Sequence, residues 1–124
     1  MSYADSNTEM ERPRQRVRGY VPPEEWLLRR CRRKKLMKFK SSKAEQYIDA
    51  LEKAALDVIE EAGLRGIAWL DIVVDRNDRD WFAICVASNF DSKRATPEQL
   101  QRLKDVFGTT EDPLWHTLSC SVYA

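Results

Sequence analysis

A run of basic side chains is the feature of this sequence with the clearest chemistry. Arg29-Arg30-Cys31-Arg32-Arg33-Lys34-Lys35 carries six positive charges in seven residues, and residues 26–43 contain no Asp or Glu. Lys and Arg neutralise phosphates and release the counterions condensed on a nucleic acid, which favours binding. Solvated surfaces usually mix both signs of charge, so the run predicts a polyanion-binding surface, with nucleic acid as the leading ligand.

The charge of the whole chain is divided between two parts. Residues 1–43 carry 13 Lys or Arg and 5 Asp or Glu, a net charge of +8, whereas residues 44–124 carry 8 and 15, a net charge of −7. This division is typical of a phosphate-binding arm attached to a folded module. The predicted nucleic-acid contacts are the basic residues of that arm, namely Arg12, Arg14, Arg16, Arg18, Arg29, Arg30, Arg32, Arg33, Lys34, Lys35, Lys38 and Lys40.

Binding of this kind has weak sequence specificity, because phosphate contacts position a protein without reading bases. DNA and RNA both fit it. An acidic protein or an anionic membrane surface would attract the arm as well. The arm lacks the wide apolar face of a helix that lies on a membrane, so no membrane partner is expected. The same residues also resemble a nuclear-localisation patch in composition.

An acidic and aromatic hairpin is the second charged region. One of its predicted faces carries Trp69, Asp71, Asp75 and Trp81, and together with Trp26 of the arm these are the predicted partner contacts. In the leading interpretation the acidic domain supports the arm through partner contacts or self-association. The alternative is a protein-interaction module, an inhibitor or adaptor, that engages complementary charge and anchors on tryptophan.

Patterns for catalysis or metal binding are weak. His116 is the single histidine, and Cys31, Cys85 and Cys120 are widely spaced without a C-x-x-C pair, so we interpret all four as packing residues. The sequence therefore predicts a non-enzymatic protein with no cofactor, metal or small-molecule substrate. The odd number of cysteines suits reduced thiols and the chain shows no long apolar run, so the predicted location is cytoplasmic.

The basic part is predicted to have two pieces. Residues 1–20 are polar with alternating arginines and are expected to form a mobile tail. Residues 21–40 are expected to form a basic helical arm that begins at Pro23. Its six charges fall on nearly every side of a helix, so no apolar stripe is expected there. Residues 41–124 are expected to form the acidic domain.

A helix over about residues 43–62 is the most strongly predicted element. Apolar residues recur there at helical spacing, Ser42 and Glu45 have the spacing of a capping box, and Gly63 suits the left-handed residue after a helix. Gly63-Leu64-Arg65-Gly66 is similar in spacing to the G-x-x-G loop of KH domains, but that loop joins two helices. Here the segment leads from helix to strand, so we interpret its glycines as a helix stop and a turn.

Residues 67–76 and 81–90 are predicted to form a β-hairpin. A two-fold centre near Asp78 places Ile72 opposite Ile84, with a loop of about three or five residues. Leu51, Ile72 and Ile84 are then expected at the centre of one core.

The opposite face of the hairpin carries Trp69 and Trp81 and has no cover nearby in the sequence. Large apolar patches tend to mark contact sites. We expect the 21–39 segment, another copy or a partner to cover this face.

The last part of the chain is predicted to contain a helix and a strand. Thr96, Pro97 and Gln99 have the positions of N-cap, first residue and capping-box partner, Gly108 ends the helix, and 114–123 alternates like a strand. The predicted fold is a small α+β domain of order α-β-β-α-β. Its short, mainly antiparallel sheet has helices on one face, and the basic N-terminal arm and helix precede it.

Overall fold

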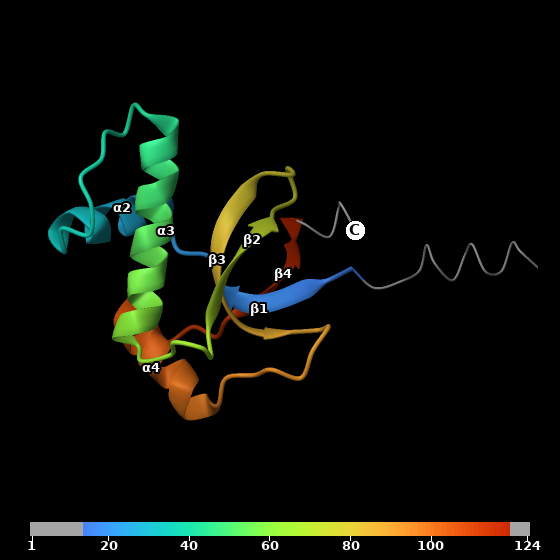
Figure 1. Ribbon diagram of the computed structural model, residues 1–124. Helices are drawn as coiled ribbons and strands as arrows, with labels where there is room; N and C mark the ends of the chain where they lie inside the picture. Colours follow the sequence, from blue (N-terminus) through green and yellow to red (C-terminus); the bar gives the residue numbers. More distant parts are fainter. Residues whose placement is uncertain (1–13, 120–124) are drawn as a thin grey trace, which may run out of the picture.

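The computed structural model describes residues 14–119. These residues form a small α+β domain, as predicted, with three helices gathered on one side of a four-stranded antiparallel sheet (Figure 1). In chain order the elements are β1 (Arg16–Tyr20), α2 (Glu24–Arg33), α3 (Ala44–Glu61), β2 (Trp69–Val74), β3 (Asp80–Ser88), α4 (Pro97–Phe107) and β4 (Leu114–Leu118).

The sheet closes into a barrel in the strand order β1-β3-β2-β4, because β4 also pairs with β1. The expectation of a mobile tail is therefore wrong for Arg16–Tyr20, which is a strand between β3 and β4. Its arginines alternate because the residues between them, Val17 and Gly19, are buried. The part of the predicted tail before residue 14 lies outside the described residues.

Closure of the barrel depends on Gly19. The register between β1 and β3 shifts at this point, since Arg18 pairs with Ala87 and Gly19 pairs with Cys85. A Cβ atom on Gly19 would collide with the carbonyl oxygen of Ile84. Glycine therefore lets the two backbones approach each other at a β-bulge.

The β2–β3 hairpin forms where it is predicted, but in a different register. Ile72 pairs with Phe82 rather than Ile84, a displacement of two residues that leaves each side chain on its predicted face. The turn explains the register. The Asp75 carboxylate accepts hydrogen bonds from the backbone N–H groups of Asn77 and Arg79, which holds a connection over residues 75–79.

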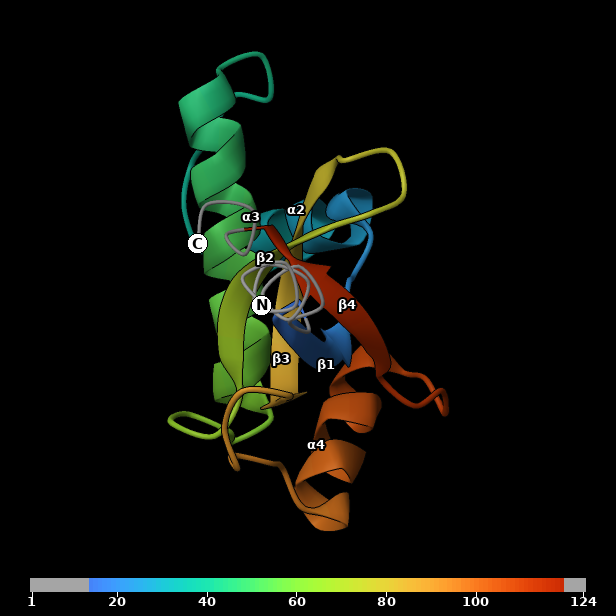
Figure 2. The same cartoon turned by 90° about the vertical axis from the view of Figure 1, so that its right-hand side faces the viewer.

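The two faces of this hairpin pack against different parts of the chain. The outer face, with Ile84 and Val86, packs against Leu51 of α3 and against α2. The inner face lies inside the barrel, where it meets Val17 of β1 and Leu118 of β4. The cover for the tryptophan face thus comes mainly from β1 and β4 (Figure 2). Of the 21–39 segment, Val21 also packs there, whereas Trp26, Leu27 and Leu28 pack in the other core cluster, so the expectation is wrong for these three.

Ile72 does not lie at the centre of the core. Its exposed fraction is 42%, whereas Leu51 and Ile84 are 2% and 0% exposed. The reason is a groove that separates α3 from β2 at this point.

The predicted basic arm is part of the folded domain. Leu27, Leu28 and Cys31 of α2 are buried in the same core cluster as α3. These three residues form an apolar stripe, so the expectation that none exists is wrong. The charged residue Arg30 also turns inward on this face. The helix ends at Arg33, and residues 34–43 form a connection that runs beside the N-terminal half of α3 (Figure 1).

The long helix α3 confirms the predicted helix over 43–62. Its N-cap is Lys43 and no side chain caps it, so the predicted capping box of Ser42 and Glu45 is wrong. Gly63 has the expected left-handed conformation, with φ of 70°.

The predicted ends of α4 are both confirmed. Thr96 and Gln99 form a reciprocal capping box, and Gly108 ends the helix with φ of 68°. The strand β4 matches the first half of the predicted strand, and residues 120–123 lie outside the described part of the chain. Within residues 14–119, the combination of length and apolarity needed to span a membrane occurs in none of the helices.

Candidate nucleic-acid interface

Exposed cations cluster on the end of α2 and on the connection that follows it. We call this cluster the basic surface; its members are Arg29, Arg32, Arg33, Lys35, Lys38 and Lys40. Each is exposed, and none forms an ion pair with another described residue. Two of them, Arg32 and Arg33, lie in the last turn of α2, where the helix dipole stabilises positive charge. The fold therefore tolerates this cluster without an acidic partner.

The sequence predicts phosphate contacts for Arg30 and Lys34 as well, but the structure places both in an internal ion-pair network. Arg30 is 3% exposed, and its guanidinium donates to Asp57 at 2.9 Å and to Glu61 at 2.7 Å. The ammonium of Lys34 contacts the same two carboxylates. These two cations hold α2 against α3. Arg30 is buried, which leaves little of its side chain open to a ligand. The Lys34 side chain is 32% exposed, so its phosphate contact stays a prediction.

The network shifts the pKa values of its members. Burial alone would raise the pKa of Asp57, but hydrogen bonds from Lys34 and Arg30 outweigh it and hold that pKa below its usual value. Hydrogen bonds from Lys34 and then Arg30 lower the pKa of Glu61, and the bond to Asp57 raises the pKa of Lys34. The charges of the two acids and the two bases therefore cancel one another at neutral pH.

A depression of about 600 Å³ lies within the basic surface. It is lined by Arg32, Lys35 and Lys38 together with Met37 and Phe39. The Arg32 guanidinium lies over the Phe39 ring, 4.6 Å from its centroid. The Nη2 of the same guanidinium donates to the Ser41 hydroxyl at 3.0 Å. The depression is thus lined by three cations and two apolar side chains.

Lys35 occupies a backbone conformation that favours glycine. Its φ is 54°, and the turn is held by hydrogen bonds from Lys35 N to the Arg32 carbonyl and from Leu36 N to the Cys31 carbonyl. A non-glycine residue in the left-handed region costs about 1 kcal/mol. The chain therefore keeps a positive charge at the rim of the depression where glycine would be more stable.

The arginines of the N-terminal segment lie apart from the basic surface. Arg14 precedes β1 and Arg16 begins it, at the end of the strand that points away from the helices (Figure 1). Arg18 donates from Nε to the carbonyl of Pro113 at 3.2 Å. The structure does not bring these predicted contacts together with α2, and Arg12 lies outside the described residues.

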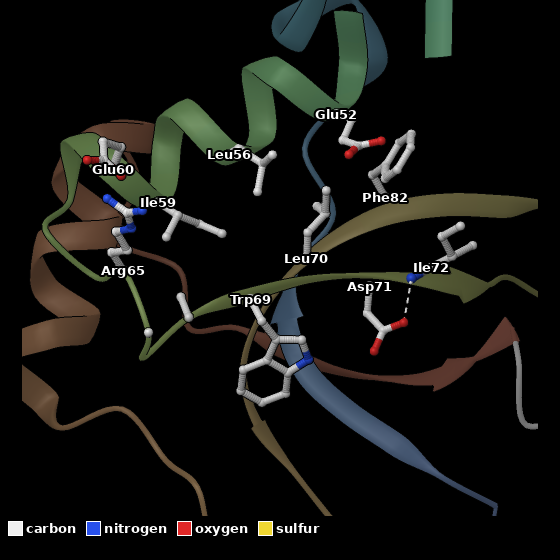
Figure 3. Close-up of a pocket in the computed structure, with 12 residues that line it drawn as sticks. Glu52, Leu56, Ile59, Glu60, Arg65, Trp69, Leu70, Asp71, Ile72 and Phe82 are labelled. Carbon is white, nitrogen blue, oxygen red and sulfur yellow. Dashed lines mark hydrogen bonds between the residues drawn. The ribbon is translucent and has the colours of Figure 1, made fainter. Parts of the chain in front are cut away.

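Three of the predicted partner contacts are engaged inside the domain. Trp26 packs on Phe107, with 5.3 Å between ring centroids, and belongs to the main core. Trp81 donates from Nε1 to Asp75 at 2.9 Å, and this bond is the foremost cause that lowers the pKa of Asp75. The remaining two, Trp69 and Asp71, line the groove between α3 and β2 (Figure 3).

The remaining reactive side chains are buried or isolated. Cys31 and Cys85 are free and buried, and burial followed by the charge of Asp71 raises the pKa of Cys85 to about 12. Burial lowers the pKa of His116, although a hydrogen bond with the Gly19 backbone opposes this. In the region from 14 to 119, no group of three His, Cys, Asp or Glu is placed to hold a metal ion. Cys120 is not among the described residues.

No protein-family model, curated protein or solved structure matches this chain. Its function must therefore be inferred from its own side chains and their arrangement.

The sequence does not point to every part of the interface. Met37 and Phe39 look like a further apolar turn of the helix, but the helix has already ended at Arg33 and they line the depression instead. The ion pairs that Arg30 and Lys34 form with Asp57 and Glu61 have a signal in the sequence. The two bases are four residues apart, and the two acids on α3 have the same spacing.

Proposed function

We propose that the protein binds the phosphate backbone of nucleic acid through the basic surface. The observation that supports this most strongly is that the domain neutralises only some of its clustered cations. Arg30 and Lys34 are paired with the acids of α3, whereas the six members of the basic surface face solvent without an ion pair to a described residue. Like charges held close together repel one another, so an anionic ligand stabilises such a surface.

The arrangement favours a polymer of phosphates over one small anion. The cations are distributed along the end of α2 and the connection after it, which suits a repeating line of charge. Phe39 and the guanidinium of Arg32 add flat surfaces beside them. Aromatic rings and guanidinium groups stack on unpaired bases, so we expect single-stranded segments to be preferred. Contacts of this kind do not read the sequence.

Charge reversal tests the proposal. In fluorescence anisotropy with a labelled single-stranded oligonucleotide, Arg32→Glu/Lys35→Glu/Lys38→Glu should lower the affinity at least about a hundredfold at low salt. The matched control is Lys53→Glu/Lys93→Glu/Arg94→Glu, which reverses three exposed residues outside the basic surface. It changes the net charge by the same amount, and we expect it to lower the affinity less than about tenfold.

Salt dependence provides the second measurement. If all six cations contact phosphates, the slope of log affinity against log salt concentration for a single strand should be about −4. Equal losses of affinity in the two triple variants would show that net charge alone attracts the ligand. That result, or a slope near zero, would contradict a phosphate-binding basic surface.

A further inference from the structure

A partly apolar groove lies between α3 and β2, away from the basic surface. Its volume is about 910 Å³, and its apolar lining includes Leu56, Ile59, Leu70, Ile72 and Phe82 (Figure 3). Leu56 and Ile72 both line the groove and are 46% and 42% exposed. Exposed apolar patches tend to mark contact sites.

The groove follows α3 further toward its N-terminal half. A smaller depression of about 250 Å³ shares Ile72 and Phe82 with it, and Ile48 on α3 is 51% exposed there. Ile48 and Leu56 are thus two exposed apolar residues on one side of this helix, with the acid Glu52 between them.

Within residues 14–119, the barrel seam between β2 and β4 is short, and the rest of the β2 edge forms one wall of the groove. β2 pairs with β3 along its whole length, but with β4 at Val73 and Val74 alone. The edge of Trp69–Ile72 that faces away from β3 has no strand beside it within residues 14–119. The N–H of Ile72 instead donates to the side chain of its neighbour Asp71 at 2.9 Å. Open edges of this kind accept an added strand.

The charges at the groove indicate what kind of strand it accepts. Glu52, Glu60 and Asp71 line it, against the single base Arg65. A second copy of this chain paired through the same edge would bring these acids toward their own counterparts, and like charges opposite each other are destabilising. A segment that carries basic residues would be attracted instead.

We propose that this groove is a docking site for an extended segment of a partner protein in which apolar and basic residues alternate. The segment adds to the Trp69–Ile72 edge as a strand. Its apolar side chains face α3 beside Leu56 and Ile72, and its basic side chains lie on the other face beside Asp71. Strand addition replaces the local bond from the Ile72 N–H to Asp71, which frees that carboxylate for a cation.

This site is separate from the proposed nucleic-acid interface. Asp57 and Glu61 face α2, whereas Leu56 and Glu60, one residue earlier in each turn of α3, face the groove. The acidic lining repels a polyanion, so oligonucleotide and peptide should bind without competing. Loss of either activity therefore leaves the other testable.

A labelled peptide of alternating lysine and valine, K-V-K-V-K-V-K with blocked ends, is the probe. We expect it to bind the full chain in fluorescence anisotropy. Leu56→Lys places a like charge in the groove at an exposed position and should weaken binding at least about tenfold. The control Lys53→Ala, at another exposed position of α3, should leave binding unchanged. Amide NMR shifts should concentrate at Leu70, Asp71 and Ile72.

Two further peptides test the two parts of the proposal. E-V-E-V-E-V-E should bind at least about tenfold more weakly, because its charge matches the groove. A peptide with proline at the central valine lacks an edge N–H and should also bind more weakly. Equal binding of either peptide, or no binding of the first, would overturn the proposal. A dimer in sedimentation that Leu56→Lys dissociates would also overturn it, because the groove would then bind a second copy. So would peptide binding that appears only after removal of residues 1–13 or 120–124, because the groove would then bind a segment of this chain.

Discussion

The guanidinium of Arg30 lies 2.9 Å from the carboxylate of Asp57, and this contact joins the basic half of the chain to the acidic half. The side chain of Arg30 is almost fully buried, and Asp57 is 20% exposed. Breaking a buried ion pair by removing one partner is costly, because the other charge remains without compensation. The position of the basic surface on the domain thus depends on this pair.

We expect Asp57→Asn to lower the free energy of unfolding by about 2 to 4 kcal/mol, because it leaves Arg30 buried with less negative charge around it. Arg30→Met replaces the buried cation with an apolar chain of similar length and should cost less, since two acids then remain with Lys34 at a more exposed position. Urea denaturation of both variants measures the difference. A larger loss for Arg30→Met than for Asp57→Asn would contradict this account.

Stability should fall in acid because of the same network. The pKa values of Asp57 and Glu61 lie below their unfolded values of 3.8 and 4.5, so the unfolded chain binds more protons in that range. The stabilisation is fully present above about pH 5 and is lost as the pH falls through the lowered folded values. Urea denaturation between pH 7 and pH 3 should show this loss, and Asp57→Asn/Glu61→Gln should reduce the slope. An unchanged slope in the double variant would exclude the network as its source.

Replacing Lys35 should separate stability from binding. Lys35→Gly removes the strain of the left-handed backbone and should raise the free energy of unfolding by about 0.5 to 1 kcal/mol. The same change removes a cation and should lower nucleic-acid affinity by about fivefold. Lys35→Ala is the control, because it loses the charge and keeps the strain. Thermal denaturation and anisotropy on the three proteins check both effects, and equal stability of the two variants would argue against backbone strain.

The two isoleucines of the hairpin should respond differently to truncation. Ile84→Ala removes a fully buried side chain and should cost about 2 to 5 kcal/mol. Ile72→Ala affects a side chain that is 42% exposed and should cost less than about 1 kcal/mol. Thermal melting of both variants measures this, and similar shifts would mean that the groove beside Ile72 is filled.

Local patterns in the sequence are enough to predict the helices α3 and α4. The capping box of Thr96 and Gln99 and the left-handed Gly108 depend on neighbouring residues, so they can be read directly. The first strand cannot be found in this way. In β1 the buried positions are Val17 and a glycine, which give almost no apolar signal. Its strand character comes from pairing with β3 and β4, which are distant in the sequence.

The candidate site shows the same division. Arg32, Arg33 and Lys35 are exposed, as phosphate contact requires. Charge composition cannot distinguish them from Arg30, whose burial follows from the packing of α2 on α3. The groove depends on the angle between α3 and β2 and on where β4 stops pairing, which no local pattern records.

Closure of the barrel also constrains the order in which the protein can fold. Arg16 at the start of β1 pairs with Thr117 near the end of β4, so this seam joins strands that are almost the whole described chain apart. Contacts so distant in sequence form late, because the intervening loop must first lose its freedom. On a ribosome, α2 and α3 can pack together before β4 has been synthesised. Until β4 arrives, the inner face around Val73 and Cys85 stays uncovered, and the nascent chain is open to aggregation through it.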